Sequence, residues 1–252
     1  MTLLYFFIFM IGASIGSFLN VCIYRLPLKQ SIVSPPSHCP GCNTPIRFYD
    51  NIPVLSYIIL GGRCRTCRSP ISVQYVSVEI FNAVGYIFLF REFGLSPEFI
   101  IFALFFSSLV VLSVIDLYYK ILPDVITIPG IILGITLSAF ILPAGLKNSI
   151  IGVLIGGGLF YIVAVVSRGG MGGGDIKLIA MIGAFLGWRD VIITIMLASF
   201  LGAVIGVMMM IFLGKGRKYA IPFGPFLALG GMISLFFSEA IIEWYLGISL
   251  HY

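Results

Sequence analysis

Long apolar stretches separated by short polar segments are the dominant pattern of this chain. An α-helix needs about 20 apolar residues to cross the roughly 30 Å of hydrocarbon in a bilayer. The pattern therefore predicts an all-α integral membrane protein with about eight transmembrane helices, of which the sixth is the shortest. The eight stretches are residues 2–24, 72–90, 98–119, 125–142, 149–167, 175–188, 190–213 and 220–246.

The composition agrees with this class. The 252 residues are 60% hydrophobic and 10% charged, and the mean hydropathy is +1.11, whereas soluble proteins contain about 25% charged residues. The first stretch is expected to be an uncleaved anchor, because no basic segment precedes it and it is too long for the apolar part of a signal peptide. The net charge of +5 is spread over several loops. This spread favours membrane topology and anionic lipid over nucleic acid.

The lysines and arginines predict how the chain is oriented. If the amino terminus is outside, twelve of the fifteen fall in cytoplasmic loops, and only Arg91, Lys147 and Arg189 remain outside. Cytoplasmic loops of membrane proteins are enriched in these residues. The distribution therefore places Asp116 and Asp175, which lie at ends of apolar stretches, at the cytoplasmic face.

One sizeable polar insert interrupts the apolar pattern. We expect a first transmembrane helix at 1–24, a small cytoplasmic loop domain at 25–71, and a transmembrane core at 72–252. An insert of this size buries little apolar core, so a metal cross-link is one way for it to fold.

The insert contains two C-x-x-C pairs separated by 21 residues, and they consist of Cys39, Cys42, Cys64 and Cys67. Each short turn can aim two sulfurs at one ion, and this spacing is typical of a tetrahedral zinc site. Two disulfides are the alternative, but they are rare in a reducing cytosol. A thioredoxin-like redox motif would need a strand and helix that this loop lacks. Zinc with a structural role is therefore favoured.

Two carboxylates suggest chemistry. A charged residue at membrane depth costs about 3 kcal/mol or more, so Asp116 and Asp175 require an explanation. Asp175 follows the glycine-rich run 169–174 and begins an apolar stretch. At the amino terminus of a helix there, the helix dipole would favour its ionised form. Two carboxyls that meet share one proton and can activate water against an amide. Our hypothesis is that Asp175 is ionised and Asp116 protonated. For each alone, a purely structural role is equally open: Asp175 as an N-cap, or Asp116 as a partner of Lys120.

Several other residues are candidate substrate- or cofactor-binding residues. Glu79, at the cytoplasmic end of the second stretch, could contact substrate or cofactor, or could equally form a salt bridge. The glycine run lacks the Lys and Ser/Thr that complete a phosphate-binding loop, so close approach of an extended peptide explains it better. Asp124 is expected to be a helix N-cap. The binding candidates are Glu79, Gly172, Gly174 and Lys177.

Together these motifs resemble the prepilin leader peptidases, membrane aspartic proteases of the G-x-G-D type. The resemblance implies that Asp116 and Asp175 are the catalytic pair. It also implies that the substrate is a prepilin or pseudopilin, cut at the cytoplasmic face of the bacterial inner membrane between a basic leader and a hydrophobic helix. The sequence leaves open whether this precursor belongs to a type IV pilus, a type II secretion system or a DNA-uptake system. The residues that carry it are 16–27, the two C-x-x-C pairs, Asp116 with 122–124, 170–178 and 221–227.

The resemblance implies a second activity as well. Many members methylate the new amino terminus with S-adenosylmethionine, and those members typically carry the four-cysteine loop, which is present here. We therefore expect an endopeptidase that is also an N-methyltransferase, with no nucleic-acid partner. Nothing else in the sequence indicates a methyl-donor pocket.

Two other classes remain alternatives. A transporter that carries protons or cations would place acids near the bilayer midplane within inverted repeats, whereas the acids here lie at one face. A non-catalytic assembly scaffold organised by the zinc loop would leave precursor processing intact after Asp116→Asn or Asp175→Asn.

Overall fold

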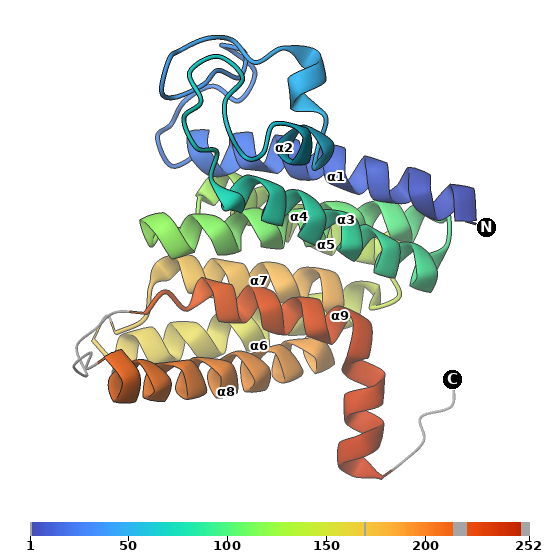
Figure 1. The fold of residues 1–252 in the computed structure, drawn as a ribbon. Coiled ribbons are helices and arrows are strands. Elements are labelled where there is room, and N and C mark those ends of the chain that lie inside the picture. Colours follow the sequence, from blue (N-terminus) through green and yellow to red (C-terminus); the bar gives the residue numbers. More distant parts are fainter. Residues whose placement is uncertain (1, 169, 214–220, 248–252) are drawn as a thin grey trace. The chain divides into compact units, whose positions relative to one another are not determined.

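In a computed structural model, the described residues are 2–168, 170–213 and 221–247, and their regular elements are all helical (Figure 1). The prediction of an all-α protein is confirmed. Gly169 of the glycine run lies outside the described ranges, and so do three of the twelve basic residues counted above as cytoplasmic, namely Lys215, Arg217 and Lys218. The elements are α1 (Thr2–Arg25), η1 (Phe48–Asn51), α2 (Leu55–Ile59), α3 (Val73–Phe93), α4 (Pro97–Tyr119), α5 (Asp124–Phe140), α6 (Gly145–Val166), α7 (Gly173–Leu186), α8 (Trp188–Leu213) and α9 (Gly224–Leu246).

The chain divides into two compact units, Met1–Val111 and Leu112–Tyr252, with the boundary inside α4. In the first unit α1 packs along α3. A Cβ atom on Gly16 would lie 2.7 Å from the Cα of Glu79, so only glycine permits this approach. The Asn82 side chain also donates to the Gly12 carbonyl at 2.9 Å. In a bilayer the hydrophobic effect does not drive helices together, so small residues that allow close packing and interhelical hydrogen bonds stabilise their association.

The insert between α1 and α3 is tied to the end of α1 by Arg25, whose side chain is buried. Its guanidinium donates to the carbonyls of Ser31, at 2.9 Å, and Pro35, at 2.7 Å. The short helices η1 and α2 pack together, and the Ser56 hydroxyl donates to the Tyr49 carbonyl at 3.0 Å. The sequence pattern did not predict either helix.

In the second unit α7 is the central helix and packs against α5, α6, α8 and α9. Residues 178–186 are all buried. A Cβ atom on Gly183 would lie 2.5 Å from the backbone of Gly152, and the hydroxyls of Ser138 and Ser149 both donate to the Ala184 carbonyl. With 14 residues, α7 is about 21 Å long. This is less than a bilayer requires, so α7 is a core helix of its unit.

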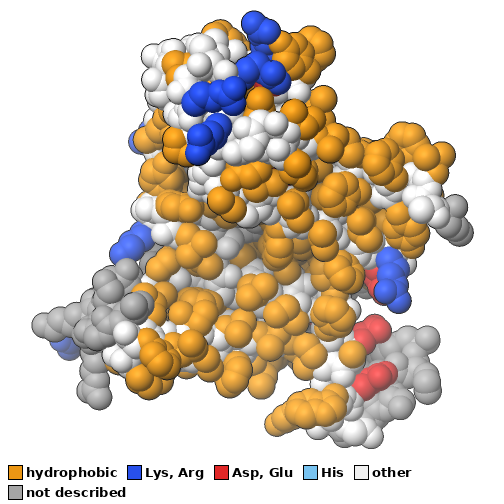
Figure 2. Space-filling view, in the orientation of Figure 1, with side chains coloured by type: hydrophobic (Ala, Val, Ile, Leu, Met, Phe, Trp, Pro, Cys, Tyr) orange, Lys and Arg blue, Asp and Glu red, His pale blue; other side chains and the backbone are white. Residues whose placement is uncertain are grey.

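Six helices of the described chain are long and apolar enough to cross a membrane, namely α1, α3, α4, α6, α8 and α9. Many large apolar side chains of these helices are exposed, and Figure 2 shows them spread over one face, as expected for a multi-pass membrane protein. Each of the eight predicted stretches corresponds to a helix, but α5 and α7 fall short in length, so eight crossings stay a prediction.

The predicted start of the last helix needs correction. Residues 221–223 are not helical, and α9 begins at Gly224. Pro222 has no backbone N–H, while Pro225 lies in the first turn, the one place where a helix accepts proline readily.

Candidate functional site

Asp116 lies near the end of α4 in the second unit, and only 6% of its surface is exposed. Its Oδ2 accepts the backbone N–H of Gly224, the first residue of α9, at 2.9 Å. The first N–H groups of a helix have no partner within the helix, so a carboxyl oxygen there satisfies one of them. A Cβ atom on Gly224 would lie 2.7 Å from the same oxygen. A side chain at position 224 would therefore displace the Asp116 carboxyl or the start of α9.

Asp175 lies in the first turn of α7. The possibility that it is the N-cap is wrong, because the structure gives that position to Gly172. The N–H of Asp175 donates to the Gly172 carbonyl at 3.1 Å, and the Asp175 carboxylate accepts the N–H of Gly172. This second bond is the return arm of a capping box, in which an acidic residue in the first turn reaches back to the cap.

The two carboxyls come from helices far apart in sequence and belong to the same unit. Asp116 acts on Asp175 by direct charge interaction. Both accept a backbone N–H at the start of a helix, α9 for Asp116 and α7 for Asp175. Since like charges at close range resist double ionisation, such a pair is suited to holding a single proton.

The other candidates around Asp175 have structural contacts. Lys177 forms an ion pair with Asp124, at 2.6 Å between Nζ and Oδ1, which links α7 to the start of α5. Asp124 is the first residue of α5, and the N-cap is Pro123, so its predicted capping role is wrong. A Cβ atom on Gly174 would lie 2.9 Å from the Cβ of Leu122. Contacts of Gly172, Gly174 and Lys177 with substrate stay predictions.

Glu79 belongs to the first unit and is buried. Its Oε2 accepts the backbone N–H of Val54 at 2.7 Å, and the Ser17 hydroxyl also interacts with this carboxylate. No basic side chain of the described chain forms an ion pair with it, so the salt-bridge alternative is wrong. Val54 has a φ of +63°, which is strained for a β-branched residue. Glu79 therefore stabilises a strained turn at the start of α2.

The four cysteines of the insert come together. Their Sγ atoms all lie within 4.8 Å of one another, and those of Cys39 and Cys67 are 3.7 Å apart. Four sulfurs bound at about 2.3 Å around a tetrahedral zinc ion would be about 3.8 Å apart. All five cysteines of the chain are free thiols. The cluster therefore fits a structural zinc ion better than two disulfides.

The two C-x-x-C turns have the same local geometry. The backbone N–H of Cys39 donates to the Thr44 carbonyl at 3.0 Å, and that of Cys64 donates to the Ser69 carbonyl at 2.9 Å. In each turn the residue four positions after the first cysteine has a positive φ, 55° at Asn43 and 60° at Arg68. The Ser69 hydroxyl also lowers the pKa of the Cys39 thiol to about 6, and a thiolate is the form that binds metal.

Comparisons with known proteins agree with these features. A model described as Bacterial Peptidase A24 N-terminal domain matches residues 10–93, and a model of the Type IV leader peptidase family matches residues 103–207. A protein of Pseudomonas aeruginosa is 35% identical over 94% of this chain and 91% of its own length. The chain belongs to the type IV leader peptidase family. The resemblance seen in the sequence is confirmed, and the chain is a membrane protease.

Two further relatives give the range of similarity. A protein of Myxococcus xanthus is 40% identical over 83% of this chain, which spans 64% of that relative's length. One of Legionella pneumophila is 32% identical over 97% of this chain and 95% of its own length. All three relatives are named prepilin leader peptidase/N-methyltransferase. No solved structure shows a significant match to the chain.

Three residues with clear roles in the structure were not identified as site residues from the sequence. Gly224 lies within the motif 221–227 but received no role, although a glycine followed by proline at the start of an apolar stretch was a usable signal. The contacts of Ser17 and Val54 with Glu79 depend on the fold of the insert. No local pattern indicates them.

Proposed function

We propose that this enzyme removes the basic leader from prepilin or pseudopilin precursors, with Asp116 and Asp175 as the catalytic pair. The observation that carries this proposal is the interaction of the two carboxyls within one unit, each held by a backbone N–H at a helix start. A peptide bond is stable in water, so its hydrolysis needs a base for the water and an acid for the carbonyl.

The contacts support different roles for the two aspartates. Asp175 is the ionised member and takes a proton from a water held between the two. Asp116 carries the shared proton on Oδ1, since its Oδ2 already accepts the Gly224 N–H, and it donates this proton to the scissile carbonyl. As the C–N bond breaks, the leaving amine takes the proton from Asp175, and Asp116 recovers a proton from a hydroxyl of the tetrahedral intermediate as the new carboxyl group forms, which restores the starting state.

The enzyme lies in the bacterial inner membrane with this site at the cytoplasmic face. The excess of lysine and arginine in loops on that side supports the orientation. Both aspartates lie at helix ends. A substrate helix can therefore stay in the bilayer while its polar leader reaches the acids, which attract its positive charge.

The second proposed activity is methylation of the new amino terminus, supported by the names of the relatives. S-adenosylmethionine supplies the methyl group when it is bound. The new amine would accept this methyl group, S-adenosylhomocysteine would leave, and the proton that the nitrogen loses would pass to water. Cys39, Cys42, Cys64 and Cys67, whose sulfurs lie together, would hold a structural zinc ion that fixes the insert.

The test is cleavage of a purified prepilin by membranes containing the intact enzyme, Asp116→Asn or Asp175→Asn, with labelled S-adenosylmethionine present. Each substitution keeps the side-chain shape but removes the acid, so cleavage falls by at least about 10²-fold. Asp124→Asn is the matched control, because Asp124 lies close to this site in sequence but pairs with Lys177, and it keeps most of the activity. Full cleavage by a variant with both substitutions would contradict the proposal and favour a scaffold.

A further inference from the structure

The segment 48–60 of the insert, here called the tip, exposes many large apolar side chains. It contains η1 and α2, and the exposed apolar residues are Phe48, Tyr49, Ile52, Leu55, Ile58 and Ile59. The largest exposed fractions are 87% at Phe48 and 75% at Ile59. Leu55, Ile58 and Ile59 have the i, i+3, i+4 spacing that places residues on one face of a helix. An exposed apolar face of this kind marks a surface that something else covers.

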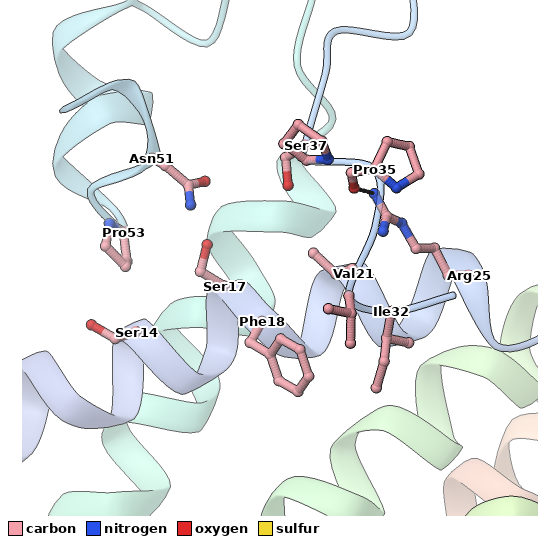
Figure 3. Close-up of a pocket in the computed structure, with 12 residues that line it drawn as sticks. Ser14, Ser17, Phe18, Val21, Arg25, Ile32, Pro35, Ser37, Asn51 and Pro53 are labelled. Atoms are coloured by element: carbon pink, nitrogen blue, oxygen red, sulfur yellow. Dashed lines mark hydrogen bonds between the residues drawn. The ribbon is translucent and has the colours of Figure 1, made fainter. Parts of the chain in front are cut away.

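The tip lies alongside α1 rather than beyond its end. Figure 3 shows Asn51 and Pro53 of the tip close to Ser14 and Ser17 of α1, in a pocket whose opposite end is lined by Arg25, the last residue of α1. Ser17 precedes Arg25 by eight residues, which is about 12 Å along a helix. Half of the hydrocarbon layer is about 15 Å deep. With Arg25 at the membrane boundary, the tip therefore lies level with the acyl chains.

The contact with α3 gives the same depth. The Val54 N–H of the tip donates to Oε2 of Glu79 at 2.7 Å. Glu79 follows Ser72, the N-cap of α3, by seven residues, which is about 10 Å along the helix. Two helices of the first unit thus place the tip at a similar distance from their ends on the side of the insert.

The backbone of the tip has the hydrogen bonds that a segment in lipid needs, since no water reaches its N–H groups there. Those of Leu55, Ser56, Ile58 and Leu60 donate to carbonyls within the tip. Position 53 is a proline, which has no N–H, and the next N–H along the chain is the one that Glu79 accepts. Glu79 therefore makes the strained turn at the start of α2 compatible with an apolar surrounding.

Charged side chains border the tip without interrupting its apolar face. Between Arg47 and Arg63 the one acidic or basic residue is Asp50, and its Oδ1 is 2.6 Å from a guanidinium nitrogen of Arg65. The guanidinium groups of Arg47 and Arg65 also lie over the Tyr49 ring, and Figure 2 shows basic and apolar side chains mixed over the insert. Apolar segments bordered by basic residues are typical of protein surfaces that lie in a membrane interface.

We propose that the tip is immersed in the leaflet on the insert's side of the membrane, which is the cytoplasmic leaflet in the orientation proposed above. The apolar face of α2 contacts acyl chains, and Arg47 and Arg63 contact anionic headgroups, which long arginine side chains reach from below. Phe18 of α1, which lines the pocket beside the tip, is itself exposed. The tip thus continues the lipid-facing surface of α1.

Other occupants of this face explain fewer of these observations. A basic leader peptide would be repelled by Arg47 and Arg63. A second copy of the chain or another protein would cover the apolar face of α2, but neither accounts for the arginines that border it or for its depth beside α1. Each is an outcome of the experiment below.

The first measurement is quenching of tryptophan fluorescence by brominated lipid. In the full-length enzyme the native Trp188 and Trp244 are replaced by phenylalanine, and the protein is placed in nanodiscs of phosphatidylcholine and phosphatidylglycerol with bromine in the acyl chains. Ile58→Trp reports on the apolar face of α2. Thr66→Trp is the matched control, since Thr66 is an exposed polar residue of the second C-x-x-C turn, outside the tip.

We expect the bromine to remove most of the emission of Ile58→Trp and little of that of Thr66→Trp. Phe48→Trp keeps an aromatic ring at an exposed position of the tip and should behave like Ile58→Trp. Quenching of both tip reporters that is no stronger than that of the control would overturn the proposal. Emission typical of an apolar surrounding but without quenching would also overturn it, because protein and not lipid would then cover the tip.

The second measurement identifies the headgroup by placing bromine on one lipid at a time. Ile58→Trp should be quenched more strongly by brominated phosphatidylglycerol than by an equal fraction of brominated phosphatidylcholine, because the arginines attract the anionic lipid. Arg47→Gln combined with Arg63→Gln should abolish this difference. Arg91→Gln, which removes an exposed arginine at the other end of α3, should retain it. Equal quenching of Ile58→Trp by the two lipids would exclude anionic headgroups as the partner of the arginines.

Prepilin cleavage in the same nanodiscs separates this proposal from the proposed function. An enzyme that cleaves prepilin while its tip is not quenched retains the proposed function and loses the immersed tip. An enzyme whose tip is quenched but which does not cleave retains the membrane contact and loses the proposed activity.

Discussion

The two units of this chain bring polar groups together in different ways. In Leu112–Tyr252 the carboxyls of Asp116 and Asp175 are positioned by the starts of the packed helices α9 and α7, with a glycine at each contact. In Met1–Val111 the polar insert is organised by four cysteines, the buried Arg25 and a carboxylate reaching in from α3. The first arrangement requires only helix packing. We propose that the second depends on a metal cross-link, so the two should fail under different treatments.

Loss of the metal cluster should have the largest effect, and that effect should be confined to the insert. Cys39→Ala removes one of four sulfurs, and zinc binding worth about 10–16 kcal/mol in small zinc domains is then largely lost. We expect the insert to become rapidly cleaved by added protease between residues 25 and 71. Limited proteolysis and zinc content measure this. Cys22→Ala, outside the cluster, is the control, and equal protease resistance in Cys39→Ala would contradict the role of the metal.

Gly224→Ala should break the second unit without disturbing the first. Its Cβ atom would lie 2.7 Å from Asp116 Oδ2, so the carboxyl or the start of α9 must move. A displacement of about 1 Å at a catalytic group can cost about 10²-fold in rate. We expect that loss in prepilin cleavage with unchanged protease resistance of the insert. Gly158→Ala, where the added Cβ atom meets nothing within 4 Å, is the control. A fully active Gly224→Ala enzyme would show that this contact does not position Asp116.

Relief of backbone strain should stabilise the insert modestly. Val54 has a φ of +63°, a conformation that glycine adopts freely, so Val54→Gly is expected to raise the stability of the insert by about 1 kcal/mol. Hydrogen exchange of the amides in α2 measures the change. Val33 is an exposed residue of the insert without a positive φ, so Val33→Gly should not raise the stability of the insert. A similar rise in stability there would show that relief of strain is not the cause.

The smallest expected effect is the response of the insert to acid. The guanidinium of Arg65 donates to both oxygens of Asp50 and lowers the pKa of that carboxyl. Its contribution to stability is therefore present above the ordinary pKa of about 3.9 and is lost as the pH falls through the lowered value. In Arg65→Gln the pKa of Asp50, followed by NMR, should rise toward its ordinary value. No rise, or an equal one in Arg63→Gln, would assign the shift to another cause.

Much of the fold could be predicted because long apolar stretches of membrane proteins form helices. The stretch 98–119 became α4, Pro97–Tyr119, with nearly the same bounds. The central position of α7 could not be predicted, since a helix that is apolar all round looks the same in lipid and in a protein core. The helices η1 and α2 were missed because helices this short are stabilised by tertiary contacts.

The candidate site divides in the same way. The cysteine cluster followed from spacing alone, since each C-x-x-C turn is a local structure. The contact between Asp116 and Gly224 could not be predicted, because it joins residues from different helices and depends on how α9 packs. The binding candidates Lys177 and Glu79 were chosen by charge, and the structure shows that each already contacts another part of its own unit.

The central claim is that carboxyls from α4 and α7 converge, and proximity in the membrane tests it most directly. Asp116→Cys and Asp175→Cys are introduced together, treated in native membranes with a short thiol cross-linker, and the joined peptides are identified by mass spectrometry. The control pair is Asp116→Cys with Asp190→Cys, because Asp190 lies at the start of α8, beyond the opposite end of α7. We predict efficient joining of positions 116 and 175 and little of the control pair. A yield no greater than that of the control would contradict the claim.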